Sequence, residues 1–173
     1  MSEIAQSHWP KQGLYDPAFE RDACGVGFVA NIRGEKSHDV VEKGVRVLEK
    51  LEHRGACGCD PDSGDGAGLL VQIPDAFLRR ELAKQSLALP ASGQYAVAMA
   101  FVSQDSAAAA RQAALFEQAV VAEGQRVLGW REVPTRPDTI GRLARAAAPR
   151  VRQLFIAAQA AAAIDQDAFE RKL

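Results

Sequence analysis

Blocks of apolar residues, separated by glycine, proline and polar turns, predict a series of short strands in this chain. The strands cover residues 25–33, 69–73, 95–102, 126–133 and 151–157. The run at 25–33 is nearly continuously apolar, which is typical of a strand that is buried on both faces. We therefore expect this first strand to lie inside the domain.

Helices are predicted between the strands. Residues 75–85 and 106–123 form helices that could stack on one side of a sheet, and a short helix over 139–148 is stopped by Pro149. A last helix begins at Asp165. Strands and helices mixed in this way indicate a layered α/β or α+β domain.

A further helix is predicted after Ser37, whose side chain can cap it, with Asp39 in the first turn. Its broad apolar face is made by Val41, Val45, Leu48 and Leu51. Val47 falls off that face. The helix should stop near Gly55.

Composition limits the class of protein. The chain has 173 residues, of which 47% are hydrophobic and 25% charged, as in one ordinary globular domain. Its 21 basic and 22 acidic residues form no block of like charge, so neither a nucleic acid nor a membrane surface is an expected partner. No stretch approaches the roughly 20 apolar residues that cross a membrane. Three cysteines without an export signal favour free thiols in the cytoplasm.

Cys24 is the first candidate for chemistry. It heads an apolar run, and Gly25 and Gly27 after it could let a substrate approach and turn their N–H groups toward an oxyanion. Residues 1–23 carry turn signals without periodicity and read as a leader. If the leader is removed, the α-amino group of Cys24, with a pKa of roughly 7.7–8.0, becomes an available base. On these residues alone, a buried structural cysteine is the commoner outcome.

Two later stretches have similar alternatives. Arg54, in the run Leu51-Glu52-His53-Arg54-Gly55-Ala56, has a donor fork suited to a carboxylate, but a basic residue also complements the end of a helix. The run Ser63-Gly64-Asp65-Gly66-Ala67-Gly68 lacks the Gly-Lys-Ser/Thr of a phosphate-binding loop, and a strand follows it instead of a helix. We reject nucleotide binding there and expect close backbone packing.

Metal binding is not expected. Cys57 and Cys59 form a single Cys-x-Cys pair, and His53 alone does not complete a zinc site. The nearby acids lack the spacing of a calcium loop; they are Asp60, Asp62 and Asp65.

Taken in order, several motifs resemble the start of glutamate synthase large subunits. They are Leu14-Tyr15-Asp16-Pro17, the run from Glu20 to Phe28, Ser37-His38, His53-Arg54-Gly55-Ala56, the run from Ser63 to Gly68, and Gly129-Trp130-Arg131-Glu132-Val133-Pro134. The resemblance extends from about Leu14 to the end of the chain. Any one motif is weak, whereas their order and spacing together are specific.

The resemblance implies a class II glutamine amidotransferase domain over residues 24–173, preceded by a leader over 1–23. The implied fold is α+β: an N-terminal nucleophile (Ntn) hydrolase-like four-layer α/β/β/α sandwich, incomplete at its C-terminal end. In that family the exposed cysteine, here Cys24, attacks the side-chain amide of glutamine. The resulting thioester is hydrolysed, and the ammonia converts 2-oxoglutarate to glutamate. Arg54 would lie near the nucleophile and bind substrate.

The resemblance also implies what lies outside these residues. FMN and an iron–sulfur cluster would belong to downstream synthase domains of the same chain, with a small subunit or ferredoxin as electron donor. The family's main carboxylate-binding arginine, its Asn-Gly oxyanion pair and its amino-binding aspartate are not found here. Residues 24–173 alone are therefore expected to be inactive. The alternative is a truncated, non-catalytic binding or assembly module.

Overall fold

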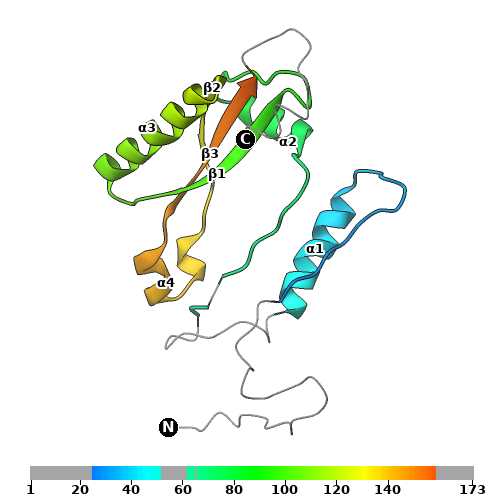
Figure 1. Ribbon diagram of the computed structural model, residues 1–173. Helices are drawn as coiled ribbons and strands as arrows, with labels where there is room; N and C mark the ends of the chain where they lie inside the picture. Colours follow the sequence, from blue (N-terminus) through cyan, green and yellow to red (C-terminus); the bar gives the residue numbers. More distant parts are fainter. Residues whose placement is uncertain (1–24, 52–61, 65, 159–173) are drawn as a thin grey trace, which may run out of the picture. The chain divides into compact units, whose positions relative to one another are not determined.

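The computed structural model describes residues 25–51, 62–64 and 66–158, which fall into two compact units divided between Leu69 and Leu70 (Figure 1). The first unit contains helix α1, His38–Lys50. The second contains α2 (Asp75–Ala83), β1 (Tyr95–Val102), α3 (Ser106–Ala122), β2 (Gln125–Glu132), the 3-10 turn η3 (Pro137–Thr139), α4 (Arg142–Ala147) and β3 (Arg150–Ala158).

The second unit is built on an antiparallel sheet with the strand order β1-β3-β2. Val97 faces Phe155 across one ladder, and Trp130 faces Leu154 across the other. Because β3 is central, its residues Leu154 to Ala157 are all buried. The predicted strands over 95–102, 126–133 and 151–157 are thereby confirmed to within one residue at each end.

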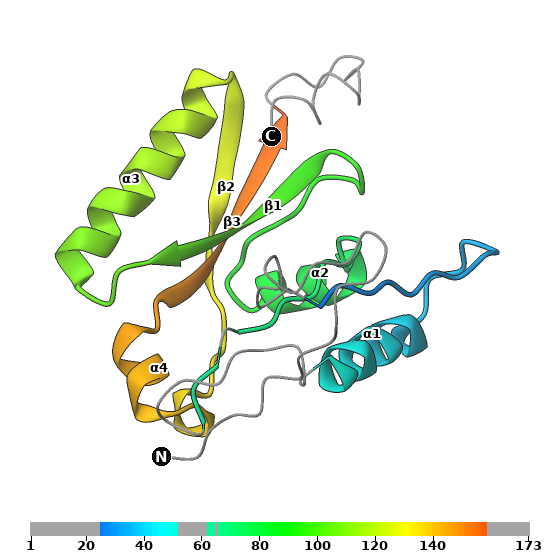
Figure 2. The same cartoon turned by 60° about the horizontal axis from the view of Figure 1, so that its bottom comes forward.

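Helices cover both faces of this sheet, as Figure 2 shows. On one face, Leu78 and Leu82 of α2 pack with Tyr95 and Phe155. On the other face, Ala109 of α3 packs with Ala100, Val102 and Trp130. Side chains along a strand alternate between its two faces, so the odd-numbered and even-numbered residues of β1 supply two different cores. The prediction that these two helices share one side of the sheet is therefore wrong.

The first unit is α1 with extended chain beside it. The segment that leads into the helix runs back along it (Figures 1 and 2). A Cβ atom on Gly27 would lie 2.6 Å from Cγ1 of Val47, and one on Gly44 would lie 2.9 Å from Cδ1 of Leu69. Val47 therefore belongs to the packed face, whereas Val45 is 43% exposed. The prediction that Val45 lies on the packed face and Val47 off it is therefore wrong.

The ends of α1 also differ from the prediction. Ser37 is at the N-cap position, but its side chain makes no capping hydrogen bond within the described residues. The helix ends at Lys50, and its C-cap is Leu51, which lies four residues before Gly55. The C-cap N–H donates back to the carbonyls of the last turn, so the helix closes on its own backbone.

The predicted strands over 25–33 and 69–73 are not formed within the described part of the chain, and residues 31–34 make a turn in which the Gly34 N–H donates to the Asn31 carbonyl at 3.0 Å. Val26, Phe28 and Leu70 are 89%, 93% and 100% exposed. A strand requires a neighbour for its backbone hydrogen bonds, and the described residues supply none here. The mixture of helices and antiparallel sheet agrees with an α+β class, but a four-layer sandwich is not formed by these residues. None of the described helices is long and apolar enough to span a membrane.

Candidate functional site

The two predicted site residues lie outside the described part of the chain. Cys24 directly precedes Gly25, where the description begins, and Arg54 follows Leu51 by three residues. The predictions that concern His53, Cys57 and Cys59 also fall outside it. The structure therefore describes the segments on either side of the predicted chemistry.

These flanking segments are in contact with each other. Gly27 lies three residues after Cys24, and it packs against Val47 of α1, the helix that precedes Arg54. Because a side chain at position 27 would collide with Val47, this glycine is required for helix packing. That requirement is separate from the predicted role of the glycine near a nucleophile.

The glycine run after α1 contains one position, Gly66, whose backbone conformation favours glycine. Gly66 has φ = +86°, a conformation that favours glycine, and no atom of the described residues lies within 4 Å of a Cβ built on Gly66 or Gly68. The described residues therefore supply no close neighbour at these two positions, and close backbone packing stays a prediction. Residues 66–74 are extended, and α2 begins only at Asp75. No helix N-terminus follows the run directly, whereas a phosphate-binding loop leads into one.

A metal ion or cofactor needs several donor side chains close together. Among the described residues, no three His, Cys, Asp or Glu side chains gather closely enough to hold a metal ion. Asp62 is exposed, and Asp60 and Asp65 lie outside the description. The described residues thus do not fit an iron–sulfur cluster, and the glycine run does not fit the phosphate of a flavin.

The predicted motif from Gly129 to Pro134 has structural roles. Gly129 follows the irregularity in the β2–β3 ladder, with φ = +154°, and a Cβ there would lie 2.3 Å from Cδ1 of Leu87. Arg131 is buried, donates to Gln153 Oε1 at 2.9 Å and lies over the ring of Phe77. These contacts fasten β2 to the sheet and to the α2 side of the unit.

Trp130 occupies the opposite face, beneath α3. Its Nε1 donates to Glu117 Oε1 at 2.7 Å, and its ring meets that of Phe116 edge to face at 6.1 Å. The guanidinium of Arg152 stacks 4.5 Å from the ring centroid, and its Nε lies 2.8 Å from Glu132. Trp130 is therefore a partly buried aromatic residue whose indole N–H has a hydrogen-bond acceptor, as is usual for tryptophan in a protein core.

A polar cluster that sequence patterns did not reveal joins α2 to β1. Tyr95 donates to Asp75 Oδ1 at 2.8 Å, and Arg79 Nε donates to Asp75 Oδ2 at 2.9 Å. Burial, followed by the hydrogen bond to Asp75 and the charge of that carboxylate, raises the pKa of Tyr95 to about 12. The hydrogen bond to Asp75 is the main cause that raises the pKa of Arg79. The i,i+4 spacing of Asp75 and Arg79 was a visible signal, but the partner 20 residues away was not.

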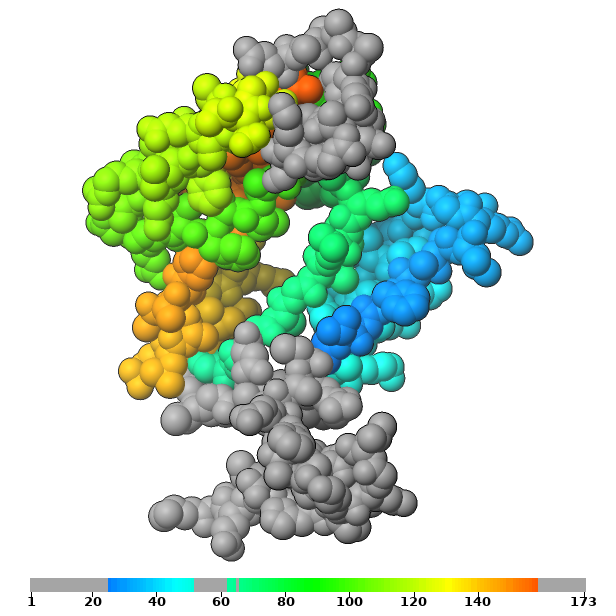
Figure 3. All heavy atoms as spheres, in the orientation of Figure 1, coloured from blue at the N-terminus to red at the C-terminus, as the bar shows by residue number. Residues whose placement is uncertain are grey.

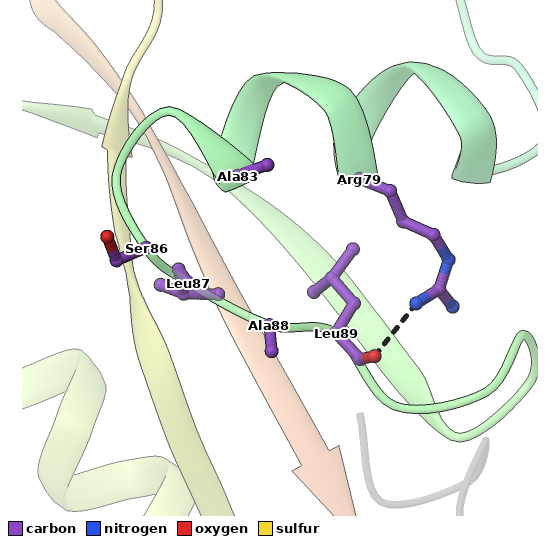
Figure 4. A pocket seen from close by; sticks show the side chains of 6 residues that line it. All are labelled: Arg79, Ala83, Ser86, Leu87, Ala88 and Leu89. Atoms are coloured by element: carbon purple, nitrogen blue, oxygen red, sulfur yellow. Dashed lines mark hydrogen bonds between the residues drawn. The ribbon is translucent and has the colours of Figure 1, made fainter.

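A shallow, open depression of about 290 Å³ lies beside this cluster, between α2 and the turn after it (Figure 4). It is lined by Arg79, Ala83, Ser86, Leu87, Ala88 and Leu89. Arg79 donates across it to the carbonyl of Leu89 at 2.8 Å and also to the carbonyl of Pro90. Each guanidinium nitrogen of Arg79 already donates to a protein oxygen, of Asp75, Leu89 or Pro90, and we therefore do not assign the depression a catalytic role.

Comparison with known proteins identifies the family. The profile of the class II glutamine amidotransferases matches residues 24–173, which is most of the chain, and the chain therefore belongs to that family. The match begins at Cys24.

Relatives of the chain are large chains of glutamate synthases. The NADPH-dependent large chain of Bacillus subtilis is 48% identical over 98% of this chain. Ferredoxin-dependent glutamate synthase 2 of Synechocystis is 42% identical over 79% of it, and the NADH-dependent enzyme of Schizosaccharomyces pombe is 37% identical over 94%. These alignments cover 11%, 9% and 8% of the relatives, so the chain spans about a tenth of their length.

Proposed function

We propose that this chain is part of the glutamine amidotransferase domain of a glutamate synthase, which in the complete polypeptide releases ammonia from glutamine. The observation that carries the proposal is the family match, which starts at Cys24, the residue that the ordered motifs single out as a nucleophile. The relatives named as glutamate synthases support the same reaction.

The proposed chemistry uses the first residue of the processed chain. Removal of residues 1–23 would free the α-amino group of Cys24, which takes the thiol proton while the sulfur attacks the amide carbon of glutamine. Breaking the carbon–nitrogen bond releases ammonia, to which that proton is delivered, and leaves a glutamyl thioester. Water then hydrolyses the thioester to glutamate and restores the thiol. The Bacillus alignment covers 98% of the chain, so it includes most of the residues before Cys24, which supports a leader shared with that relative.

Arg54 is proposed to bind the carboxylate of the substrate or to orient groups beside the thiol. Its fixed charge and planar donors suit a carboxylate. Its position after α1 supports this role, because the segment that follows Cys24 packs against the same helix through Gly27 and Val47.

The domain is proposed to complete a four-layer sandwich of the Ntn-hydrolase type. Two observations support this fold. The sheet carries a helical layer, α3, on one face, while α2 covers only part of the other, where Met99 and Phe101 remain 51% and 65% exposed. The segments at 25–33 and 69–73 have the apolar composition of strands in a second sheet.

The synthase half of the reaction is proposed to lie in other parts of the polypeptide. There the ammonia would combine with 2-oxoglutarate, with FMN and an iron–sulfur cluster carrying the electrons. The three relatives are named for NADPH, ferredoxin and NADH, although each resembles this chain over 79% or more of its length. We therefore place the choice of donor, whether through a small subunit or ferredoxin, outside these residues.

The decisive experiment is Cys24→Ala in the full polypeptide. Glutamine-dependent glutamate formation should fall by about 10³-fold or more, because the attacking sulfur is absent. Synthesis driven by added ammonium should persist, since it bypasses the thioester. Loss of both activities to the same extent would contradict an ammonia-supplying role.

The matched control is Cys57→Ala, which removes another thiol from the same region and should leave glutamine-dependent activity within about twofold. Intact mass supplies an independent reading. The wild-type protein should lack residues 1–23, whereas a retained leader would favour the alternative of a non-catalytic binding or assembly module.

A further inference from the structure

The outward side of α3 carries almost no charge. Its exposed positions away from the sheet are Ala107, Arg111, Ala114, Leu115, Gln118, Val121 and Ala122, which we call the α3 outer face. Leu115 and Val121 are 64% and 65% exposed. The space-filling view shows α3 along the outer margin of its unit (Figure 3). A helix that only meets water normally places polar residues on this side.

The contrast with α1 shows that the chain does make ordinary solvent-facing helices. The exposed positions of α1 include six charged residues, Asp39, Glu42, Lys43, Arg46, Glu49 and Lys50. The longer α3, with 17 residues against 13, exposes Arg111 as the single charge on its outer face. Large apolar side chains without interspersed charges are the composition of a contact surface.

We propose that the α3 outer face is an interface with a further domain of the same, longer polypeptide. The size of the face favours this occupant. A helix of 17 residues is about 25 Å long and about 10 Å wide, so its outer side offers a few hundred Å². A stable complex of separate molecules buries about 800 Å² on each partner, whereas a domain joined by covalent linkage needs less, because the linkage raises its effective concentration.

The relatives are long enough to contain further domains. This chain covers 11% of the Bacillus large chain and 8% of the Schizosaccharomyces enzyme. The inference thus rests on the proposed function only where that function places the chain in a longer synthase polypeptide. The facing surface should be apolar, with a carboxylate or carbonyl opposite Arg111, whose charge would otherwise be desolvated without a partner.

The test is thiol labelling of the full polypeptide with a fluorescein maleimide, with each site identified by peptide mass. Ala114→Cys places a thiol in the middle of the α3 outer face. Ala146→Cys makes the same substitution at an exposed position of α4, and Arg46→Cys marks the charged side of α1. Ala114→Cys should label at least about tenfold more slowly than either control, and all three rates should become equal in guanidinium.

Equal labelling of all three sites in the folded protein would overturn the inference. So would protection at position 114 that disappears on dilution, because it would identify a second copy as the occupant. If Ala114→Cys fails to fold, Gln118→Cys on the same face replaces it. A native polypeptide that ends at Leu173 would also overturn it. None of these labelling rates depends on the glutaminase reaction, so a result that overturns the interface is distinct from a result that overturns the role of Cys24.

Discussion

Helices α1 and α3 show opposite relations between sequence pattern and burial. The apolar and polar residues of α1 are sharply divided between two faces, yet within the described residues none of its side chains is buried. α3 is apolar on almost every side, and it buries Ala109 and Ala113 against a hydrogen-bonded sheet. The helix with the clearer pattern is therefore the one with the weaker packing.

An amphipathic pattern thus identifies the helix face that needs a packing partner, but it does not show that such a partner is present. α3 lies on β1 and β2, whose backbone groups are already paired through β3. The described contacts of α1 include Gly27 and Leu69, which lie in segments that form no ladder in the described part of the chain. Most of the stability of a helix in a protein comes from the surface it packs on. Three measurements test this difference between the two helices.

The largest expected effect is on the core of the sheet unit. Phe155 is fully buried at the centre of the sheet, so Phe155→Ala should lower the free energy of unfolding by about 3–5 kcal/mol. The matched change on α1 is Leu48→Ala, at a half-buried position, which should alter the same transition by less than about 1 kcal/mol. Guanidinium titration followed by Trp130 fluorescence in a Trp9→Phe background would measure both. Equal losses would mean that α1 shares the core of the sheet unit.

The next effect concerns the buried phenol of Tyr95, which donates to Asp75 between α2 and β1. The described ion pairs of α1 are exposed by contrast, such as Lys43 with Asp39 at 2.7 Å. The pKa of Tyr95 is raised from 10.0 to about 12, mainly by burial. Its folded pKa thus exceeds the unfolded one, so the stabilisation is fully present below pH 10 and is lost as the pH rises through 12. The loss should be about 2–3 kcal/mol.

Denaturant titrations of the wild type and Tyr95→Phe at several values between pH 9 and 12 would test this pKa. The difference between the two proteins should shrink or reverse as the pH rises, because phenylalanine does not titrate. Parallel curves over the whole range would show that the Tyr95 hydroxyl has its ordinary pKa.

The smallest effect distinguishes the two helix starts. The Asp105 side chain accepts from the N–H of Ala108 at 2.7 Å, whereas Ser37 makes no such bond in the described structure. Asp105→Ala should therefore cost about 1 kcal/mol, and Ser37→Ala should stay within about 0.5 kcal/mol. Thermal unfolding of both variants would decide, and a Ser37→Ala loss as large as that of Asp105→Ala would contradict the observed cap.

Local signals predicted the elements of the sheet unit well. β1 has the bounds predicted for it, and α3 ends one residue early, because an apolar run bounded by polar turns is a signal that acts over a few residues. The faces chosen by α2 and α3 were not predictable in the same way, since each choice depends on partners far along the chain. The same holds for Tyr95 and Asp75, which are 20 residues apart.

The candidate site divides similarly. Cys24 emerged from ordered motifs, and the family match starts at that residue. The role of Gly27 near the nucleophile stays a prediction, and its contact with Val47 depends on how the chain folds back along α1. The strands expected at 25–33 and 69–73 need neighbouring strands that the described residues do not provide, and an apolar run carries no information about where its partner is.

The central position of β3 has a consequence for the order in which the protein can fold during synthesis. β1 and β2 pair with β3, which is made last, and β1 leaves the ribosome about 50–60 residues before its partner. Until then both earlier strands expose unpaired edges, and the apolar residues of β1 have no sheet to join. A nascent chain stalled before residue 150 should therefore be sensitive to protease and to chaperone binding, and it should lose that sensitivity once β3 has emerged.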